Sequence, residues 1–241
     1  GSSISGSICI CMGCASSSRK GLQGFSEEIA RKDLSEILPG LYLCSQYCIR
    51  SAFLARVGAT HVVSVLPREK TVSVPEGLST LRVPVSDVGY ENIEIYFRSA
   101  SEFIRQGRKK REGKVIVHCA AGKSRSATVV IAYLVHSCGM SVRDAYHHVR
   151  KRRRIHPNRG FIQKLLYFEE SLVKERKGTE RKGSTNFMAE YVIETSLGGI
   201  EEAGKQGITI EGMAKALSDC DGNYADALLQ LQRTDKAAMN E

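Results

Sequence analysis

One short stretch of this sequence combines residue types that can act chemically on a bound anion. It reads His118-Cys119-Ala120-Ala121-Gly122-Lys123-Ser124-Arg125, and we call residues 118–125 the anion loop. Ionised cysteine is a strong nucleophile, and an arginine guanidinium can donate to two oxygens of one phosphate group. Glycine permits a tight turn that brings backbone amides close to a ligand. The pattern therefore predicts attack by the Cys119 thiolate on a bound phosphate group.

The residues on either side of the anion loop predict a strand and a helix. Residues 115–117 are β-branched and apolar, and residues 124–138 are apolar on nearly every side. Backbone amides between a strand end and a helix N-terminus form an anion site, because the helix dipole favours negative charge. A thiol in such a field has its pKa lowered to roughly 3.5–7.5, so we expect Cys119 to be a thiolate at neutral pH. The alternative is a buried structural cysteine.

The rest of the chain up to about residue 174 alternates between predicted strands and helices. The strands are expected at residues 36–38, 41–43, 60–66, 81–85 and 114–117. The helices are expected at residues 51–57, 92–112, 124–138, 141–153 and 160–174. This alternation predicts an α/β fold with a central, mostly parallel sheet flanked by helices.

Composition divides the chain into four parts. Residues 1–33 are rich in Ser, Gly and Cys and are expected to form a flexible tail, and residues 34–174 carry the α/β pattern. Residues 175–185 are charged and punctuated by glycine, which is typical of a linker. Residues 186–241 predict a small all-α unit, whose helices we expect at residues 186–197, 209–218 and 224–232, with Asn223 as an N-cap.

The chain is basic, with 35 Lys and Arg against 26 Asp and Glu and a net charge of +9. This balance indicates an anionic partner, namely a phosphorylated protein, an anionic lipid surface or a nucleic acid. The basic residues cluster within residues 105–111, 150–154 and 174–182, and each cluster also fits a solvated helix end. We do not expect nucleic-acid binding, because tryptophan is absent and no zinc-finger spacing occurs.

The eight cysteines lack the paired spacing of a structural zinc site, so they indicate a reducing compartment and no metal. The longest apolar runs fall short of the ~18 residues that a membrane-spanning helix needs.

His118 to Arg125, followed by Ser126, resembles the signature of the protein tyrosine phosphatases. Over about residues 34–173, the short chain resembles their small dual-specificity branch, and its entry segment resembles the atypical members. The resemblance implies hydrolysis of phosphotyrosine and of phosphoserine or phosphothreonine in proteins, through a cysteinyl-phosphate intermediate. It implies no cofactor and no metal.

The resemblance also implies roles for residues around the anion loop. The family uses an aspartate upstream of the nucleophile as general acid, and Asp87 fits this position, with a loop-capping role as the alternative. Glu91 is the other nearby carboxylate, and we rank it second. Ser126 is expected to assist departure of the thiolate, or else to cap the helix. His118 is expected to order the loop, and Asn158 to support the site.

Lys123 bears on the substrate, because a lysine within the loop resembles the phosphoinositide-type phosphatases. Their second lysine, directly after the cysteine, is replaced here by Ala120. We therefore favour phosphoprotein substrates, with a phosphoinositide or another non-protein phosphate as the alternative. A catalytically inactive phosphate-binding adaptor is a further alternative, against which the presence of Cys119, Arg125 and Asp87 argues.

The N-terminal region contains an acylation pattern at Met12-Gly13-Cys14. If translation starts at Met12, Gly13 fits N-myristoylation and Cys14 is available for palmitoylation. Two acyl chains anchor a protein stably to a membrane. The expected location is the cytoplasm, at the cytoplasmic face of a membrane if Gly13 is acylated.

The end of the chain resembles part of a second family. Ala216-Leu217, Asp221-Gly222-Asn223 and the apolar residues up to Leu231 resemble the last two helices of a ubiquitin-associated domain. This resemblance implies recruitment of ubiquitin or another protein. The alternatives are a generic three-helix bundle and a helical tail that packs on the α/β domain.

Overall fold

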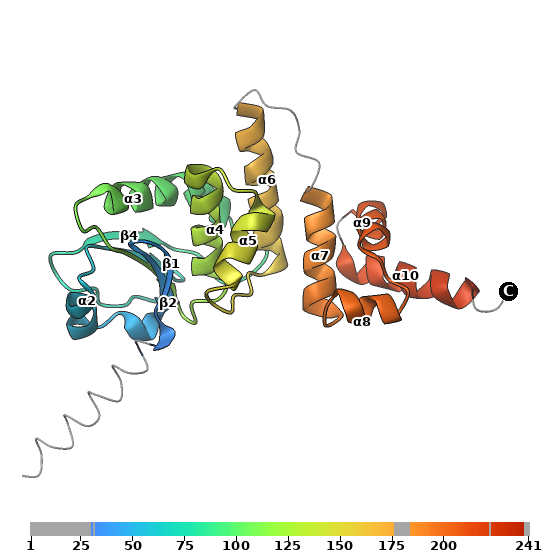
Figure 1. The fold of residues 1–241 in the computed structure, drawn as a ribbon, viewed down its shortest axis with the longest axis horizontal. Coiled ribbons are helices and arrows are strands. Elements are labelled where there is room, and N and C mark those ends of the chain that lie inside the picture. Colours follow the sequence, from blue (N-terminus) through green and yellow to red (C-terminus); the bar gives the residue numbers. More distant parts are fainter. Residues whose placement is uncertain (1–29, 31, 176–183, 222, 239–241) are drawn as a thin grey trace, which may run out of the picture.

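The structure of the protein is a computed structural model, and it describes residues 30, 32–175, 184–221 and 223–238. The predicted acylation positions Gly13 and Cys14 lie outside these residues. We refer to residues 32–175 as the sheet domain and to residues 184–238 as the helical unit; Figure 1 shows both.

The sheet domain is built on five strands. They are β1 (Ser35–Leu38), β2 (Leu41–Ser45), β3 (His61–Val65), β4 (Ser79–Val83) and β5 (Val115–Cys119). The order across the sheet is β1-β2-β5-β3-β4, with β1 antiparallel to β2 and the other neighbours parallel. This confirms the predicted mostly parallel sheet. Because β5 is the central strand, its last residue, Cys119, lies at the middle of the carboxyl edge of the sheet.

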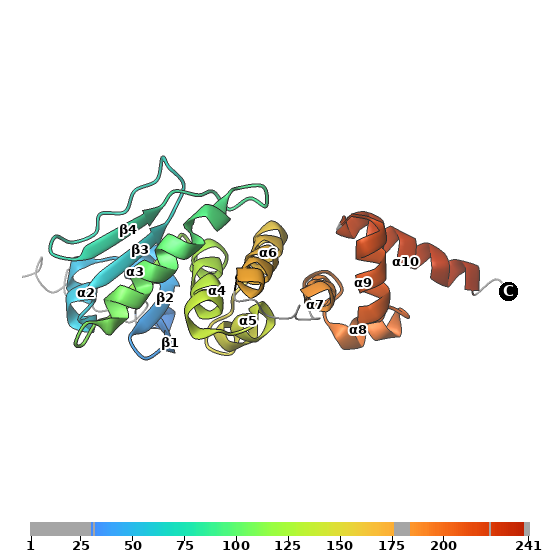
Figure 2. The ribbon, with the colours of Figure 1, turned by 90° about the horizontal axis from the view of Figure 1, so that it is seen from above.

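Helices cover both faces of this sheet (Figures 1 and 2). They are η1 (Gln46–Cys48), α2 (Ser51–Val57), η2 (Ile93–Tyr96), α3 (Phe97–Lys109), α4 (Arg125–Cys138), α5 (Val142–Arg150) and α6 (Arg159–Glu175). The α2 face buries Ile116 of β5, whereas the α3–α6 face buries Val115 and Val117. Both faces of β5 are thus dry, which explains its continuous run of apolar residues.

The predicted elements of the sheet domain are present, with shifts at their ends. The strand expected at residues 81–85 ends at Val83, because Pro84 has no amide hydrogen to continue the ladder. The helix expected at residues 141–153 ends at Arg150. Helix α4 is buried along almost its whole length, as its apolar composition predicts.

The helical unit contains α7 (Ser184–Ser196), α8 (Ile200–Lys205), α9 (Ile210–Asp219) and α10 (Tyr224–Ala238). The three predicted helices are present, and Asn223 caps α10 by accepting from the backbone amide of Ala225 at 3.1 Å. The short α8 was not predicted, because its six residues lie between glycine-rich turns. No helix within the described residues is both long and apolar enough to cross a membrane.

Helix α7 joins the helical unit to the sheet domain. Its residues Ala189 and Ile193 pack against α9, whereas Phe187 and Tyr191 are buried in the main core of the sheet domain. In both views α7 lies beside α5 and α6, with the other C-terminal helices beyond it (Figures 1 and 2). This arrangement matches the alternative in which the C-terminal helices pack on the α/β domain.

Candidate active site

The anion loop connects the end of β5 to the start of α4, as the sequence predicts. Gly122 has a φ of +67°, a left-handed conformation that favours glycine. A Cβ atom at this position would lie 2.4 Å from the carbonyl oxygen of Cys44 in β2. Glycine is therefore required here both for its backbone angle and for the close approach of the loop to the sheet.

Cys119 lies at the base of the loop, with 2% of its surface exposed. Its Sγ accepts from the backbone amide of Gly122 at 3.2 Å and from the hydroxyl of Ser126 at 3.1 Å. The sulfur atom therefore accepts two hydrogen bonds, one from the loop backbone and one from a side chain of α4. The structure thus brings Ser126, on the first turn of α4, into direct contact with the expected nucleophile.

Arg125 is 7% exposed, yet its Nε has no hydrogen-bond partner among the described residues. The nearest carboxylate oxygen, Oδ2 of Asp87, lies 3.7 Å from Nε. Leaving a buried charged donor without a hydrogen bond is costly. An anion bound in the loop would supply the missing acceptor, so this geometry fits a phosphate-binding role.

Asp87 lies at one edge of the loop, beyond the end of β4. Its Oδ1 accepts from the hydroxyl of Ser124 at 2.6 Å and from the side-chain amide of Asn158 at 3.0 Å. Asn158 is itself held, because its Oδ1 accepts from the backbone amide of Phe161 at 3.0 Å. Three residues that are far apart in the sequence therefore meet, and the contacts fall on Asp87, the carboxylate ranked above Glu91.

His118 is completely buried beneath the loop. Its Nε2 and the Ser64 hydroxyl are 2.7 Å apart. Burial lowers the pKa of His118 to about 4, although a backbone group of Cys119 offsets part of this effect. The imidazole is therefore neutral near pH 7 and is covered by protein, which fits a role in ordering the loop.

The remaining residues of the anion loop direct their carbonyl groups toward the protein. The carbonyl of Ala120 accepts from the backbone amide of Gln46 at 3.3 Å, and that of Lys123 accepts from His156 at 2.9 Å. With the carbonyl oxygens held in this way, the backbone amides of the loop remain to face an anion. The Lys123 side chain is exposed.

A family model described as "Dual specificity phosphatase, catalytic domain" matches residues 41–171, which is more than half of the chain. The chain belongs to this dual specificity phosphatase family. The match covers the anion loop, Asp87 and Asn158, and it ends before the helical unit.

Two human dual specificity protein phosphatases illustrate the relationship. Dual specificity protein phosphatase 9 is 38% identical over 62% of this chain, which spans 39% of that relative's length. Dual specificity protein phosphatase 26 is 35% identical over 65% of this chain and 75% of its own length. Among solved structures, the human tyrosine phosphatase-like serine/threonine/tyrosine-interacting protein superposes with a TM-score of 0.55. It is 34% identical, over 58% of this chain and 97% of its own.

This dual specificity phosphatase domain contains an arginine whose role the sequence did not reveal. Arg153 belongs to a basic cluster that fits a solvated helix end, yet its side chain is 9% exposed. Its Nε donates to the carbonyl of Gly122 at 2.7 Å, and a terminal nitrogen donates to that of Ala121 at 3.2 Å. Arg153 therefore holds two carbonyl groups of the anion loop.

Asp33 is the partner of this arginine, although the sequence placed it at the end of the flexible tail. Its Oδ1 accepts from Arg153 at 2.7 Å, and its Oδ2 accepts from the backbone amide of Ser45 at 2.8 Å. Burial alone would raise the pKa of Asp33, but the hydrogen bonds from Ser45 and Arg153 lower it overall. No sequence signal links Asp33 to Arg153, because their contact depends on the packing of the chain.

Within the described ranges, no three His, Cys, Asp or Glu side chains gather into a group that could hold a metal ion.

Proposed function

We propose that this dual specificity phosphatase hydrolyses phosphotyrosine and phosphoserine or phosphothreonine residues of proteins through a cysteinyl-phosphate intermediate. The observation that carries the proposal is the environment of the Cys119 sulfur. It accepts from the Gly122 amide and the Ser126 hydroxyl, near the buried Arg125, whose Nε has no hydrogen-bond partner among the described residues. Such a site suits a thiolate facing an oxyanion.

In the first step, the Cys119 thiolate attacks phosphorus and the bond from phosphorus to the substrate oxygen breaks. Asp87 donates its proton to that leaving oxygen. Arg125 and the amides of the anion loop stabilise the other three phosphate oxygens as charge redistributes in the transition state. The step leaves a cysteinyl phosphate and a released hydroxyl side chain.

In the second step, water attacks the cysteinyl phosphate and the sulfur–phosphorus bond breaks. The Asp87 carboxylate accepts a proton from that water, which restores the general acid. The hydroxyl of Ser126, 3.1 Å from Sγ, donates a hydrogen bond to the departing thiolate. Inorganic phosphate then leaves, so the cycle needs no cofactor.

The names of the curated relatives support phosphoprotein substrates, because both are called protein phosphatases. A phosphoinositide substrate rests on Lys123 alone, whose exposed side chain adds one positive charge to the loop. We therefore favour protein substrates for this chain.

Hydrolysis of p-nitrophenyl phosphate by the full chain tests the proposal. We expect Cys119→Ser to abolish turnover, and Asp87→Asn to lower kcat by about 10²-fold or more. A panel of phosphopeptides and phosphoinositides then ranks the substrates. Equal rates for the wild type and Cys119→Ser would overturn the proposed phosphatase activity and favour the phosphate-binding adaptor.

The sequence also predicts two further partners, a membrane surface and ubiquitin. We propose that Gly13 and Cys14 are acylated in a protein translated from Met12, and that this cytoplasmic protein therefore binds membranes. Intact-mass measurement of protein from its native cell tests this, since an unmodified mass would contradict it. Recognition of ubiquitin by residues 186–241 is tested by a pull-down with the full chain and purified ubiquitin.

A further inference from the structure

The helical unit contacts both residues that flank Asn158, the residue that holds the expected general acid. On one side, the hydroxyl of Tyr191 in α7 donates to the backbone carbonyl of Pro157. On the other side, the guanidinium of Arg159 donates to the hydroxyl of Ser196. Residues 157–159, which we call the Asn158 segment, are therefore held between the sheet domain and the C-terminal helices.

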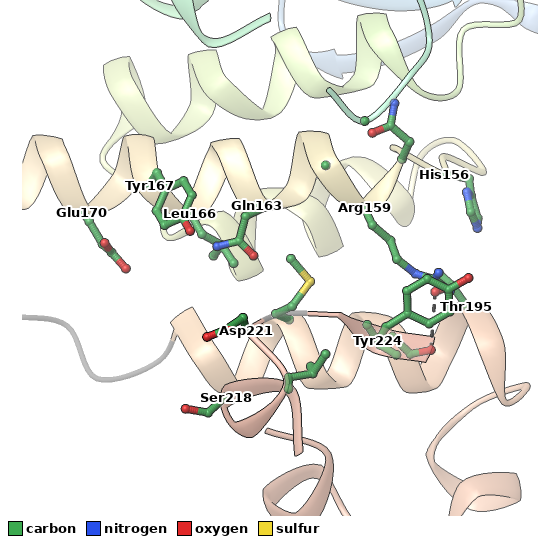
Figure 3. A pocket seen from close by; sticks show the side chains of 16 residues that line it. His156, Arg159, Gln163, Leu166, Tyr167, Glu170, Thr195, Ser218, Asp221 and Tyr224 are labelled. Carbon is green, nitrogen blue, oxygen red and sulfur yellow. Dashed lines mark hydrogen bonds between the residues drawn. The ribbon is translucent and has the colours of Figure 1, made fainter. Parts of the chain in front are cut away.

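Arg159 makes a second contact with the helical unit. Its guanidinium carbon lies 3.4 Å from the centre of the Tyr224 ring, within the range of a cation–π interaction. Figure 3 shows the Arg159 guanidinium and the Tyr224 ring close together at one end of the pocket between α6 and the helical unit. Helices α7 and α10 thus both contribute to holding this arginine.

Tyr191 is itself firmly placed. It is fully buried, and its ring meets that of Tyr146 in α5 edge-on, with centroids 5.5 Å apart. The ring of Phe187, one turn earlier in α7, lies 5.6 Å from the same Tyr146 ring. Burial raises the pKa of Tyr191, so its hydroxyl stays protonated and can donate the hydrogen bond to the Pro157 carbonyl.

Ion pairs hold α7 against α5 around this aromatic contact. Glu190 pairs with Arg143 at 2.8 Å and lies 3.3 Å from a ring nitrogen of His147. Glu194 pairs with Arg150. These pairs flank Tyr191 along α7, so the position of its hydroxyl depends on the docking of the whole helix.

Beyond these contacts the two parts are not continuously packed. A pocket of about 930 Å³ lies between α6 and the helical unit, and its lining includes Gly89, Asn158, Leu166, Met188 and Tyr224. Gly89 lies two residues beyond Asp87. The helical unit therefore reaches the Asp87 region chiefly through the contacts to Pro157 and Arg159.

We propose that Tyr191 is a positioning residue for the general acid. By holding the Pro157 carbonyl, it fixes the Asn158 segment, and Asn158 in turn holds Asp87 at 3.0 Å. The helical unit is thereby a part of the catalytic apparatus, although it contributes no group to the reacting phosphate. This inference rests on the proposed function, since it assigns Asp87 the role of general acid.

The test compares Tyr191→Phe and wild type on two substrates, p-nitrophenyl phosphate and phenyl phosphate. Phenolate is the poorer leaving group, so its departure depends more strongly on a correctly placed acid. We expect kcat for phenyl phosphate to fall about tenfold, and kcat for p-nitrophenyl phosphate to fall much less. Arg159→Met removes the contact on the other side of the Asn158 segment and should show the same pattern.

A double-mutant cycle with Asp87→Asn makes the test specific. If Tyr191 acts through Asp87, adding Tyr191→Phe to Asp87→Asn should lower kcat for phenyl phosphate no further. Equal losses in both backgrounds would overturn the inference, as would equal losses on both substrates. Tyr167→Phe is the matched control, because this tyrosine lines the same pocket but is 61% exposed and lies away from the Asn158 segment.

The outcomes separate this inference from the proposed function. Wild-type activity that does not depend on Cys119 would reject the phosphatase mechanism itself. Activity that depends on Cys119 and Asp87, but that responds to Tyr191→Phe independently of Asp87, would reject only the role of Tyr191. Thermal unfolding of each variant, measured beside kcat, shows whether a loss of activity reflects loss of fold.

Discussion

His118 is neutral in the folded protein because burial lowers its pKa from 6.5 to about 4. In the unfolded chain it is protonated below about pH 6.5, so the unfolded state binds more protons than the folded state between about pH 4 and 6.5. The free energy of unfolding is therefore unaffected by this residue above about pH 6.5, and it decreases as the pH falls from 6.5 towards 4.

We predict that His118 accounts for a loss on the order of 3 kcal/mol in the free energy of unfolding between pH 6.5 and 4. His118→Gln keeps a polar side chain but cannot titrate, so its stability should fall less steeply over this range. Urea unfolding of both proteins at several pH values measures the difference. Parallel pH profiles for the two proteins would contradict the prediction.

Two glycines with similar backbone angles allow conformation to be separated from crowding. Gly122 and Gly139 have φ values of +67° and +69°, but among the described residues no atom outside the adjoining chain lies within 4 Å of a Cβ at Gly139. We predict that Gly139→Ala lowers the free energy of unfolding by about 1 kcal/mol, because alanine is strained in the left-handed backbone region. Gly122→Ala should cost about 3 kcal/mol or more and abolish activity, because the loop must also move off Cys44. Chemical unfolding and p-nitrophenyl phosphate hydrolysis check this pair, and similar losses in both variants would count against it.

At the scale of elements, the anion loop is held from the side by the segment that joins α5 to α6. Arg153, on that segment, bonds two loop carbonyls and the Asp33 carboxylate. The chain before β1 and the turn after α5 are thus connected beneath the same loop. Groups that bind a ligand must be held within about 0.5 Å of their working geometry, and such outer contacts provide this.

We predict that Arg153→Met destabilises the protein by about 3 kcal/mol, because it leaves the half-buried Asp33 carboxylate without its partner. It should also weaken inhibition by inorganic phosphate about tenfold, since the loop carbonyls lose their donor. The matched control is Arg154→Met, which removes an exposed neighbouring arginine and should change stability by less than about 0.5 kcal/mol. Unfolding and inhibition are both measurable on the full chain, and equal effects of the two variants would refute a specific role for Arg153.

At the scale of the whole molecule, the sheet domain and the helical unit share a core. Phe187 and Tyr191 of α7 belong to the same buried cluster as Tyr146 of α5 and Phe161 of α6. A substitution in the helical unit should therefore also lower the stability of the sheet domain. The linker composition of residues 175–185 does not imply two independent parts.

We predict that Phe187→Ala lowers the free energy of unfolding by about 3–4 kcal/mol, because it leaves a cavity in the shared core. Loss of phosphatase activity and loss of helical circular dichroism should then occur at the same, lower urea concentration. Leu229→Ala is the control, because Leu229 in α10 is 50% exposed and its loss should cost less than about 0.5 kcal/mol. If activity in Phe187→Ala persisted beyond the loss of helix signal, the two parts would not be coupled.

Local patterns were sufficient to predict most of the fold. The central strand carries the β-branched run Val115-Ile116-Val117, α4 is apolar over most of its length, and the turn between them is marked by Gly122. Asp87 and Asn158 were predicted through the resemblance to the phosphatases, and the structure brings their side chains into contact beside the anion loop. The short α8 and the end of β4 differ from expectation, because a single turn of helix and a proline boundary carry weak periodic signals.

The sequence by itself determined the anion loop, because its strand, turn and helix are consecutive and their contacts are local. Tertiary structure alone decided which distant residues hold that loop. Arg153 looks like any other member of a basic cluster, and Tyr191 looks like any apolar residue of an amphipathic helix. Their bonds to the Gly122 and Pro157 carbonyls depend on how α5, α6 and α7 pack, and spacing along the chain does not encode such long-range packing.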